Sequence, residues 1–302
     1  MRKVVLALDL GGTNARFAAV REDGQVLARA HGKTPRFGTS GPVLQMISGG
    51  FAEVTEMLAG QTFIGVAAAV PFGSGQGVLT DLPNLPALEG VDLGDEIRRS
   101  IGLTVEIVND ATAATIGEHW LGASQGFENV IGVTLGTGVG GGLIIGGRPY
   151  FGASGSAGEV GHICVEPDGP PCGCGSRGCV EQFASGTAIV RMANEAGSSV
   201  ESSLELFEFA KSGNESAAAV FHKMGTYLGI AFAGLVNLLN PDLIVVGGGV
   251  SAGWELFIED VRNEVSKRAF RDPAERVKIV RASLGDDAGV LGAARIAFER
   301  IG

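Results

Sequence analysis

Short apolar runs that end in glycine-containing turns are the main pattern of hydrophobic and polar positions in this chain. Residues 4–8 are apolar, residues 9–14 are polar and glycine-containing, and residues 15–20 are again mostly apolar. Apolar runs of about four to eight residues bounded by turn residues are typical of buried strands. A charged turn at 21–24 and a third run at 25–30 complete the pattern. The chain is therefore expected to begin with three strands joined by tight turns.

The same pattern returns in the second half of the chain. A strand is expected at 130–135, a glycine-rich loop at 136–142 and a strand at 143–145, followed by a hairpin turn at Gly146-Gly147. We interpret this repetition as an internal duplication. The expected fold class is α/β with two related domains flanking a cleft, at 1–113 and 114–302, and a final helix at about 288–300 is expected to pack back on the first domain.

Strands and helices are expected in alternation between and after these repeats. The remaining strands are expected at 63–70, 105–108, 242–246 and 277–282. Helices are expected at 42–58, 111–121, 186–196, 203–211, 216–239 and 288–300, and from about 254. The most apolar stretch, 229–239, is shorter than a membrane span and contains Asn237, so a buried core helix is expected there.

Composition and charge narrow the function classes. Hydrophobic residues make up 45% and charged residues 19% of the chain, which is typical of a folded protein. The net charge of −10 opposes nucleic-acid binding, which requires a basic face. The apolar run after the N-terminus stops at Asp9, which is too short for a signal peptide. A cytoplasmic protein with no nucleic-acid or membrane partner is expected.

Three glycine-rich turns are candidates for phosphate and nucleotide binding. The segment 9–14 (DLGGTN) offers backbone amides and a hydroxyl to phosphate oxygens and a carboxylate to Mg²⁺, although an ordinary hairpin remains the alternative. The segment 136–141 (GTGVGG) fits a dinucleotide fingerprint, but a strand follows it rather than a helix, which favours a second phosphate hairpin. The loop at 247–249 follows a strand and suits an adenosine. The candidate ligands are Asp9, Gly11, Gly12, Thr13, Asn14, Gly136, Thr137, Gly138, Gly247, Gly248 and Gly249.

Asp110 is the candidate for acid–base chemistry. It follows Asn109 at the end of an expected strand and precedes the helix expected at 111–121. A carboxylate in this place is suited to accept a proton from a substrate hydroxyl. The alternative is an aspartate that caps the helix, which is the commoner role at such a position.

All four cysteines lie between residues 164 and 179, which favours a metal site over a disulfide framework. Cys172, Cys174 and Cys179 with His162 form a ligand set for a closed, structural zinc site. Cys164 is an alternative fourth ligand, and reduced thiols without metal are the other alternative.

Together these motifs resemble those of the ROK family (repressors, open reading frames, kinases), and within it the bacterial glucokinase-like sugar kinases. The resemblance covers nearly the whole chain: 9–14 and 136–141 resemble the phosphate motifs, 247–253 the adenosine motif, and 159–162 with the cysteine cluster the family signature. It implies an actin/hexokinase-type (ribonuclease H-like) fold, ATP and Mg²⁺ as cofactors, structural Zn²⁺, and a homodimer or homotetramer.

The resemblance also implies roles for individual residues. Asp110 matches the catalytic base, and His162 matches a residue that binds zinc through one ring nitrogen and faces the sugar with the other, which favours it over Cys164. The implied reaction transfers the ATP γ-phosphoryl group to the 6-hydroxyl of a hexose, with D-glucose expected and N-acetylmannosamine, mannose, allose or fructose as alternatives. The implied sugar ligands are Asn84, Asn109, Asp110, Glu159, His162 and Glu181.

One departure and three rival functions qualify this expectation. The chain has Val70-Pro71-Phe72-Gly73 where the family usually has Gly-Pro-Val-Asp, so the floor of the sugar pocket is expected to differ. A sugar-responsive repressor would carry an N-terminal helix-turn-helix, for which the motif starting at Asp9 leaves no room; a regulator without a DNA-binding domain is the remaining form of that rival. A dehydrogenase and a non-catalytic sugar-binding protein are the others.

Overall fold

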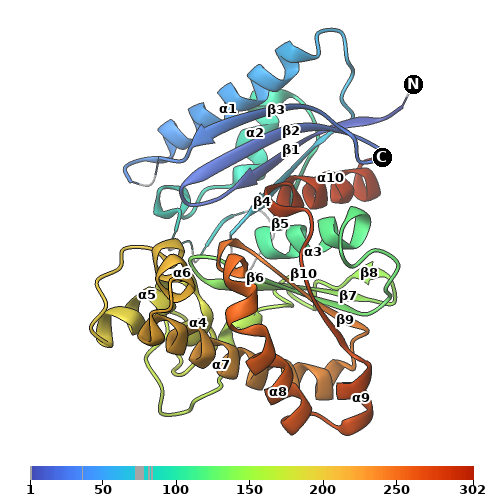
Figure 1. Ribbon diagram of the computed structural model, residues 1–302. Coiled ribbons are helices and arrows are strands. Elements are labelled where there is room, and N and C mark those ends of the chain that lie inside the picture. Colours follow the sequence, from blue (N-terminus) through green and yellow to red (C-terminus); the bar gives the residue numbers. More distant parts are fainter. Residues whose placement is uncertain (1, 36, 72–77, 81, 83) are drawn as a thin grey trace. The chain divides into compact units, whose positions relative to one another are not determined.

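The computed structural model describes residues 2–35, 37–71, 78–80, 82 and 84–302. The chain folds into two compact units (Figure 1). The first unit comprises Met1–Gln125, Pro149–Ala157 and Asp286–Gly302, and the second comprises Gly126–Arg148 and Gly158–Gly285. A five-stranded sheet of mixed strand directions lies at the centre of each unit.

The sheet of the first unit has the strand order β3-β2-β1-β4-β5. Its strands are β1 (Val4–Leu10), β2 (Asn14–Arg21), β3 (Val26–Lys33), β4 (Val66–Val70) and β5 (Val105–Asn109). The central strand β1 pairs antiparallel with β2 and parallel with β4. Every residue of β1 except Asp9 is buried, because helices cover both faces of the sheet.

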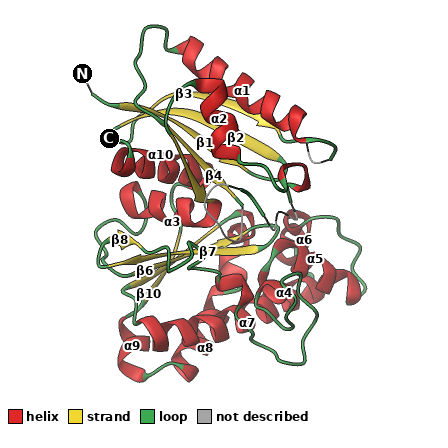
Figure 2. Ribbon diagram, turned by 180° about the vertical axis from the view of Figure 1, so that it is seen from behind, coloured by secondary structure: helices red, strands yellow, loops and turns green. Residues whose placement is uncertain are grey.

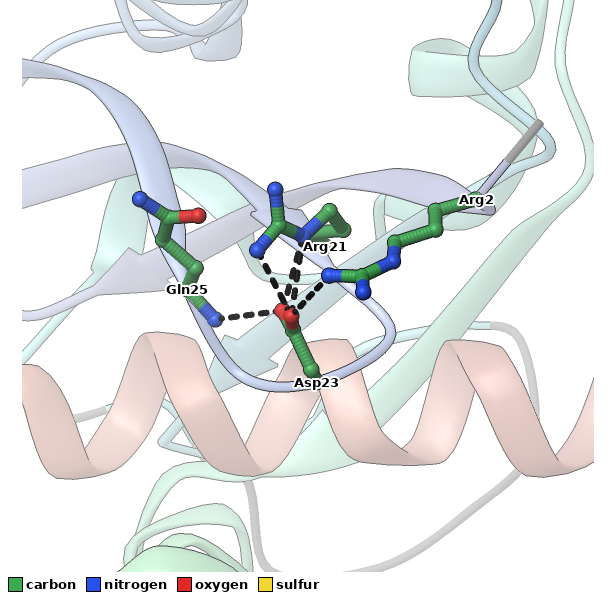
Figure 3. Close-up of polar contacts among 4 residues, drawn as sticks. All are labelled: Arg2, Arg21, Asp23 and Gln25. Carbon is green, nitrogen blue, oxygen red and sulfur yellow. Dashed lines mark hydrogen bonds and ion pairs between the residues drawn. The ribbon is translucent and has the colours of Figure 1, made fainter.

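The turn expected at 21–24 is present between β2 and β3, and Asp23 closes it (Figure 3). The Asp23 carboxylate accepts hydrogen bonds from the side chains of Arg21 (2.6 Å) and Arg2 (2.9 Å) and from the backbone N–H of Gln25 (3.2 Å). The hydrogen bonds from Arg21 lower the pKa of Asp23 to about 2. Gly24 completes the turn at φ +86°, a left-handed conformation that favours glycine.

Helices cover the two faces of the first sheet (Figures 1 and 2). On one face lie α1 (Ser40–Met57) and α2 (Leu93–Ile101), and on the other lie α3 (Asp110–Leu121) and α10 (Ala288–Arg300). The buried rings of Phe17 and Phe51 meet edge to face with centroids 5.3 Å apart, which joins β2 to α1. A short 3₁₀ helix, Pro86–Leu88, precedes α2.

The sheet of the second unit repeats this arrangement with the order β10-β9-β6-β7-β8. Its strands are β6 (Val130–Leu135), β7 (Val139–Ile145), β8 (Arg148–Pro149), β9 (Leu243–Gly247) and β10 (Lys278–Arg281). The central strand β6 pairs antiparallel with β7 and parallel with β9, as β1 does with β2 and β4. The predicted duplication of an α/β unit is therefore confirmed.

The longest helix of the second unit, α7 (Glu215–Leu239), packs against four others: α4 (Glu181–Ala184), α5 (Gly186–Glu195), α6 (Ser203–Lys211) and α8 (Ile258–Arg268). Among the described residues, α7 is the one helix long and apolar enough to span a membrane, and 61% of its apolar window is buried inside the protein. This burial agrees with the core helix expected there. The other helical segments of this unit are η2 (Val160–His162), η3 (Gly249–Leu256) and α9 (Arg271–Arg276).

Several elements differ from those expected. The expected boundary between residues 113 and 114 falls inside α3, which belongs to the first unit because it packs against α10. The loop expected at 136–142 is shorter, since β7 begins at Val139 and takes up three glycines. The helix expected from about 254 is a 3₁₀ segment followed by α8. The helices α2 and α9 had no counterpart in the sequence prediction.

Two glycines let α3 and α10 approach closely. A Cβ atom on Gly292 would overlap the carbonyl oxygen of Ala113, and one on Gly117 would overlap that of Ala288. We expect Gly292→Ala to lower the free energy of unfolding by about 1–3 kcal/mol, because two packed backbones have to move apart. Urea unfolding measures the difference.

Gly49→Ala is the matched control for that substitution. Gly49 is also helical, in α1, but outside its own helix none of the described residues has an atom within 4 Å of its hypothetical Cβ. Alanine there is expected to be neutral or to stabilise by up to about 1 kcal/mol through helix propensity. Equal unfolding free energies for the two variants would show that the crossing of α3 and α10 tolerates a side chain.

Candidate functional site

The first glycine hairpin joins β1 to β2. The backbone N–H of Gly11 donates to the Asn14 carbonyl oxygen (2.9 Å), and the Thr34 hydroxyl donates to the Gly11 carbonyl oxygen (2.8 Å). Asn14 itself accepts a hydrogen bond from Lys33 (2.8 Å). A Cβ on Gly12 would lie 2.8 Å from the backbone oxygen of Asn84, so the segment that carries Asn84 packs on this turn.

Asn109 and Asp110 have different roles at the start of α3. The Asn109 side chain accepts a hydrogen bond from the Thr112 N–H (3.0 Å), which makes Asn109 the N-cap of the helix. Asp110 is the first helical residue, and its carboxylate accepts from the Ala111 N–H (2.8 Å). Burial raises the pKa of Asp110 above the usual range of an aspartate. The capping role considered for Asp110 therefore falls to its neighbour.

Asp9 lies within the electrostatic reach of Asp110, inside β1 rather than in the turn. Burial raises the pKa of Asp9 to about 6, and the negative charge of Asp110 acts in the same direction. Arg16, with Nη1 at 3.5 Å from the Asp9 carboxylate, opposes this rise, and its other nitrogen pairs with Asp286 (3.0 Å). The first turn of α10 also abuts Asp9, since a Cβ on Gly289 would lie 2.7 Å from its carboxyl carbon.

Sequence reasoning missed Arg16 and Asp286 as neighbours of the Asp9 carboxylate. The acidic pair Asp286-Asp287 directly before the helix 288–300 was the available signal. Arg16 gave no signal, because its contact with Asp9 depends on strand pairing: Asp9 and Arg16 lie opposite each other in the β1–β2 ladder.

The raised pKa of Asp9 predicts a cost in stability at neutral pH. Between the ordinary pKa of 3.8 and about 6, the folded state holds a proton that the unfolded state has released, so stability falls as pH rises through this window. Asp9→Asn is therefore expected to be more stable than the wild type at pH 7 by about 1–3 kcal/mol, and equally stable near pH 4. Urea unfolding at both pH values measures this.

Asp23→Asn is the control with the opposite sign. The pKa of Asp23 is lowered, so its carboxylate stabilises the folded state above the ordinary pKa, and this contribution is lost as pH falls toward about 2. Asparagine at position 23 is expected to destabilise the protein at pH 7. A loss of stability in Asp9→Asn at pH 7 would contradict the interpretation that burial makes ionisation of Asp9 unfavourable in the folded state.

In the second unit, the ligand atoms of His162, Cys172, Cys174 and Cys179 all lie within 4.8 Å of one another. The Sγ of Cys172 is 3.7 Å from Nδ1 of His162, and the Sγ atoms of Cys174 and Cys179 are 3.7 Å apart. In a tetrahedral zinc site with bonds of about 2.3 Å, ligand atoms lie about 3.8 Å apart. The donor set and its spacing therefore fit Zn²⁺, and Cys164, which is exposed, is outside the cluster.

Two carboxylates, those of Glu159 and Glu181, lie beside this cluster. Nε2 of His162 lies 4.0 Å from Oε2 of Glu159, on the ring edge away from Cys172. Oε1 of Glu181 lies 4.0 Å from Sγ of Cys172. Glu159 and Glu181, predicted as sugar ligands, thus both lie beside the cluster in the second unit, whereas Asn84, Asn109 and Asp110 belong to the first.

The second glycine hairpin and the loop 247–249 also meet in this unit. The backbone N–H of Gly136 donates to the Gly138 carbonyl oxygen (2.9 Å), which closes the turn between β6 and β7. Gly248 has φ +85°, and a Cβ there would overlap the backbone of Leu135, directly before this turn. The two predicted nucleotide motifs are therefore neighbours. Of the stretch Val70-Pro71-Phe72-Gly73, Phe72 and Gly73 lie outside the described residues.

A model described as the ROK family matches residues 5–300. The chain belongs to the ROK family. This ROK protein is 33% identical to a glucokinase of Thermotoga maritima, over 99% of this chain and 98% of that relative. A solved ROK glucokinase from Streptomyces griseus, in complex with glucose and AMPPNP, is 34% identical over 98% of this chain and 99% of that one, with a TM-score of 0.84. A putative xylose repressor of Caldicellulosiruptor is 35% identical over 76% of this chain and 60% of the repressor.

The resemblance seen in the sequence is thus confirmed at the level of the family. The fold class is confirmed as well, since the two α/β domains with mixed sheets match solved ROK structures along nearly their whole length.

Proposed function

We propose that this ROK protein transfers the γ-phosphoryl group of ATP to the 6-hydroxyl of a hexose, with D-glucose as the preferred substrate. The main support for the proposal is the carboxylate of Asp110, which is partly buried at the start of α3 and lies within electrostatic reach of Asp9. The glucose specificity is supported by the similarity to glucokinases, including the one solved with glucose and AMPPNP.

Asp110 is the proposed general base. The 6-hydroxyl oxygen forms a bond to the γ-phosphorus while the bond between that phosphorus and the bridging oxygen of ADP breaks, and the hydroxyl proton passes to Asp110. The raised pKa of Asp110 suits this step, because a base is most effective when its pKa approaches the working pH. Positioning and charge stabilisation supply most of the remaining acceleration.

The glycine hairpins are the proposed phosphate sites. Backbone amides in tight glycine turns bind phosphate oxygens without a basic side chain, which agrees with a net charge of −10. When bound, Mg²⁺ neutralises phosphate charge, and Asp9 is the residue proposed to hold it through water. The pKa of about 6 at Asp9 leaves its carboxylate ionised at neutral pH, as this role requires.

Sugar recognition is proposed to rest on Asn84, Asn109, Glu159, His162 and Glu181 together with Asp110. Amide and carboxylate groups pair with sugar hydroxyls and reject analogues that lack one. His162 is suited to a double role, because Nδ1 points to the cysteine cluster while Nε2 points toward Glu159. The proposed Zn²⁺ at His162, Cys172, Cys174 and Cys179 is structural, since four protein ligands leave no open position.

A panel of hexoses tests the proposal. A coupled enzymatic assay measures the release of ADP from Mg-ATP. This release is expected to depend on added sugar and to be fastest with D-glucose. Mannose, N-acetylmannosamine, N-acetylglucosamine, allose and fructose complete the panel. Faster turnover of one of these sugars would make it, rather than D-glucose, the preferred substrate. If no sugar in the panel stimulated ADP release, the proposed kinase activity would be wrong.

A sugar-responsive regulator is the second candidate, because the chain is 35% identical to a putative xylose repressor. Such a protein would bind the sugar without turning over ATP, so the same assay separates the two functions. We further propose a cytoplasmic homodimer or homotetramer without nucleic-acid or membrane partners. Light scattering of the purified protein tests the assembly.

A further inference from the structure

The loop 136–139, which comprises the turn between β6 and β7 and the first residue of β7, is held by the segment that follows the last cysteine of the cluster. This loop is the second proposed phosphate hairpin, so its shape determines where its backbone amides point. Within the second unit, three hydrogen bonds join it to residues 181–187, and a close packing contact joins it to the 3₁₀ turn η2 that ends at His162.

The first contact comes from Glu181. Its Oε2 atom accepts a hydrogen bond from the Val139 N–H (2.9 Å), and the same atom occupies the space in which a Gly138 side chain would stand. Glu181 begins α4, two residues after the buried ligand Cys179. One carboxylate oxygen is therefore engaged in supporting the loop, whatever the other oxygen binds.

The second and third contacts come from the start of α5. The Gly186 N–H donates to the Gly136 carbonyl oxygen (2.7 Å), and the Thr187 hydroxyl donates to the Thr137 carbonyl oxygen (2.9 Å). Ser185 caps α5 by accepting from the Ala188 N–H (3.1 Å), which fixes the first helical turn. Two successive carbonyl groups of the loop are thus held by one helix terminus.

The segment on the other side of the cluster packs on the same loop. A Cβ on Gly161 would overlap the carbonyl oxygen of Val139, and one on Gly141 would lie 2.5 Å from the carbonyl oxygen of Gly158. The 3₁₀ turn Val160–His162 therefore lies directly against the beginning of β7. The loop is flanked by two segments that the cysteine cluster ties together.

We propose that Thr187 and Glu181 are positioning residues for the second phosphate hairpin, and that the cluster supports nucleotide binding as well as sugar binding. The inference rests on the proposed kinase function. Holding three backbone groups of the loop fixes the directions of the adjacent amides, so less conformational entropy is lost when phosphate binds. Thr187 is the decisive residue, because no sugar-binding role is proposed for it.

The test is Thr187→Val, which keeps the side-chain shape and removes the hydroxyl. Loss of one hydrogen bond that orders the loop is expected to raise KM for ATP about 3–10-fold. KM for the sugar and the zinc content should stay at wild-type values. Thr187→Ser, which restores the hydroxyl, should recover a KM for ATP close to that of the wild type. Calorimetric titration with AMPPNP in the absence of sugar should show the same loss of affinity.

Thr226→Val is the matched control. Thr226 also donates its hydroxyl to a backbone carbonyl, that of His222 (3.0 Å), but within α7, so its KM for ATP should not change. If the wild type is active and Thr187→Val has the same KM for ATP as the wild type, this inference is wrong while the proposed function stands. A wild type that phosphorylates no hexose would overturn the proposed function and this inference with it.

Discussion

Replacing Asp110 with asparagine is expected to lower kcat for hexose phosphorylation by about 10²–10⁴-fold. Asparagine has nearly the same shape and still accepts a hydrogen bond from the Ala111 N–H, so α3 should start at the same residue. It cannot take up the hydroxyl proton, and it carries no charge to orient that hydroxyl. Steady-state kinetics give kcat, and calorimetry with the sugar alone should show that binding persists.

Asp95→Asn is the control for this change. Asp95 lies in the same unit, near the start of α2, and forms exposed ion pairs with Arg98 and Arg99. Its removal is expected to leave kcat unchanged, because exposed pairs contribute little. Near-normal turnover in Asp110→Asn would mean that Asp110 only stabilises the first turn of α3, a role that Asn109 already fills as the N-cap.

Loss of the proposed zinc is expected to have the other large effect. Structural zinc binds zinc-finger peptides with apparent free energies of about 10–16 kcal/mol at pH 7, so a segment built around it should lose its order without it. We expect about one zinc per chain in the purified protein, and Cys179→Ser to lower that ratio, the midpoint of thermal unfolding and the activity together. Cys179 is fully buried, so the serine hydroxyl that replaces its thiol cannot turn to solvent.

Cys164→Ser separates the two candidate ligand sets. Cys164 is exposed and its sulfur lies outside the cluster, although its backbone pairs with that of Cys179. This variant should keep its zinc and its activity, whereas His162→Ala should lose zinc. A metal-free wild type that is fully active would contradict the zinc assignment. Loss of zinc in Cys164→Ser would instead identify Cys164, rather than His162, as the fourth ligand.

Local sequence patterns were sufficient for much of the fold. The two hairpins and their repetition in both halves of the chain follow from apolar runs punctuated by glycine, a pattern that depends on neighbours in sequence. The three clustered cysteines were equally accessible, because ligand spacing is itself a sequence property, whereas the choice of His162 over Cys164 depended on the family resemblance. Gly140 to Gly142 misled the prediction, since glycine usually ends a strand, whereas here it lets β7 pack against the turn at Gly158.

Features that depend on contacts between distant residues were not predictable. Arg16 reaches Asp286 across 270 positions of sequence, and α3 joins the first unit through a crossing with α10 at the other end of the chain. Thr187 resembles any exposed threonine until its hydroxyl is seen to donate to the Thr137 carbonyl oxygen. The helix α2, in contrast, was missed although its signals are local: Asp92 caps it, and Leu93, Ile97 and Ile101 follow one another at the helical spacing of one apolar face.

This chain is proposed to phosphorylate a hexose from ATP, with Asp110 as the base. Phosphorus NMR of a mixture of the protein, Mg-ATP and D-glucose tests it most directly, because the spectrum identifies both products and the phosphorylated position. We expect equal amounts of ADP and glucose 6-phosphate with the wild type and almost none of either with Asp110→Asn. ATP that stays intact, or ADP that forms with inorganic phosphate and no sugar phosphate, would contradict it.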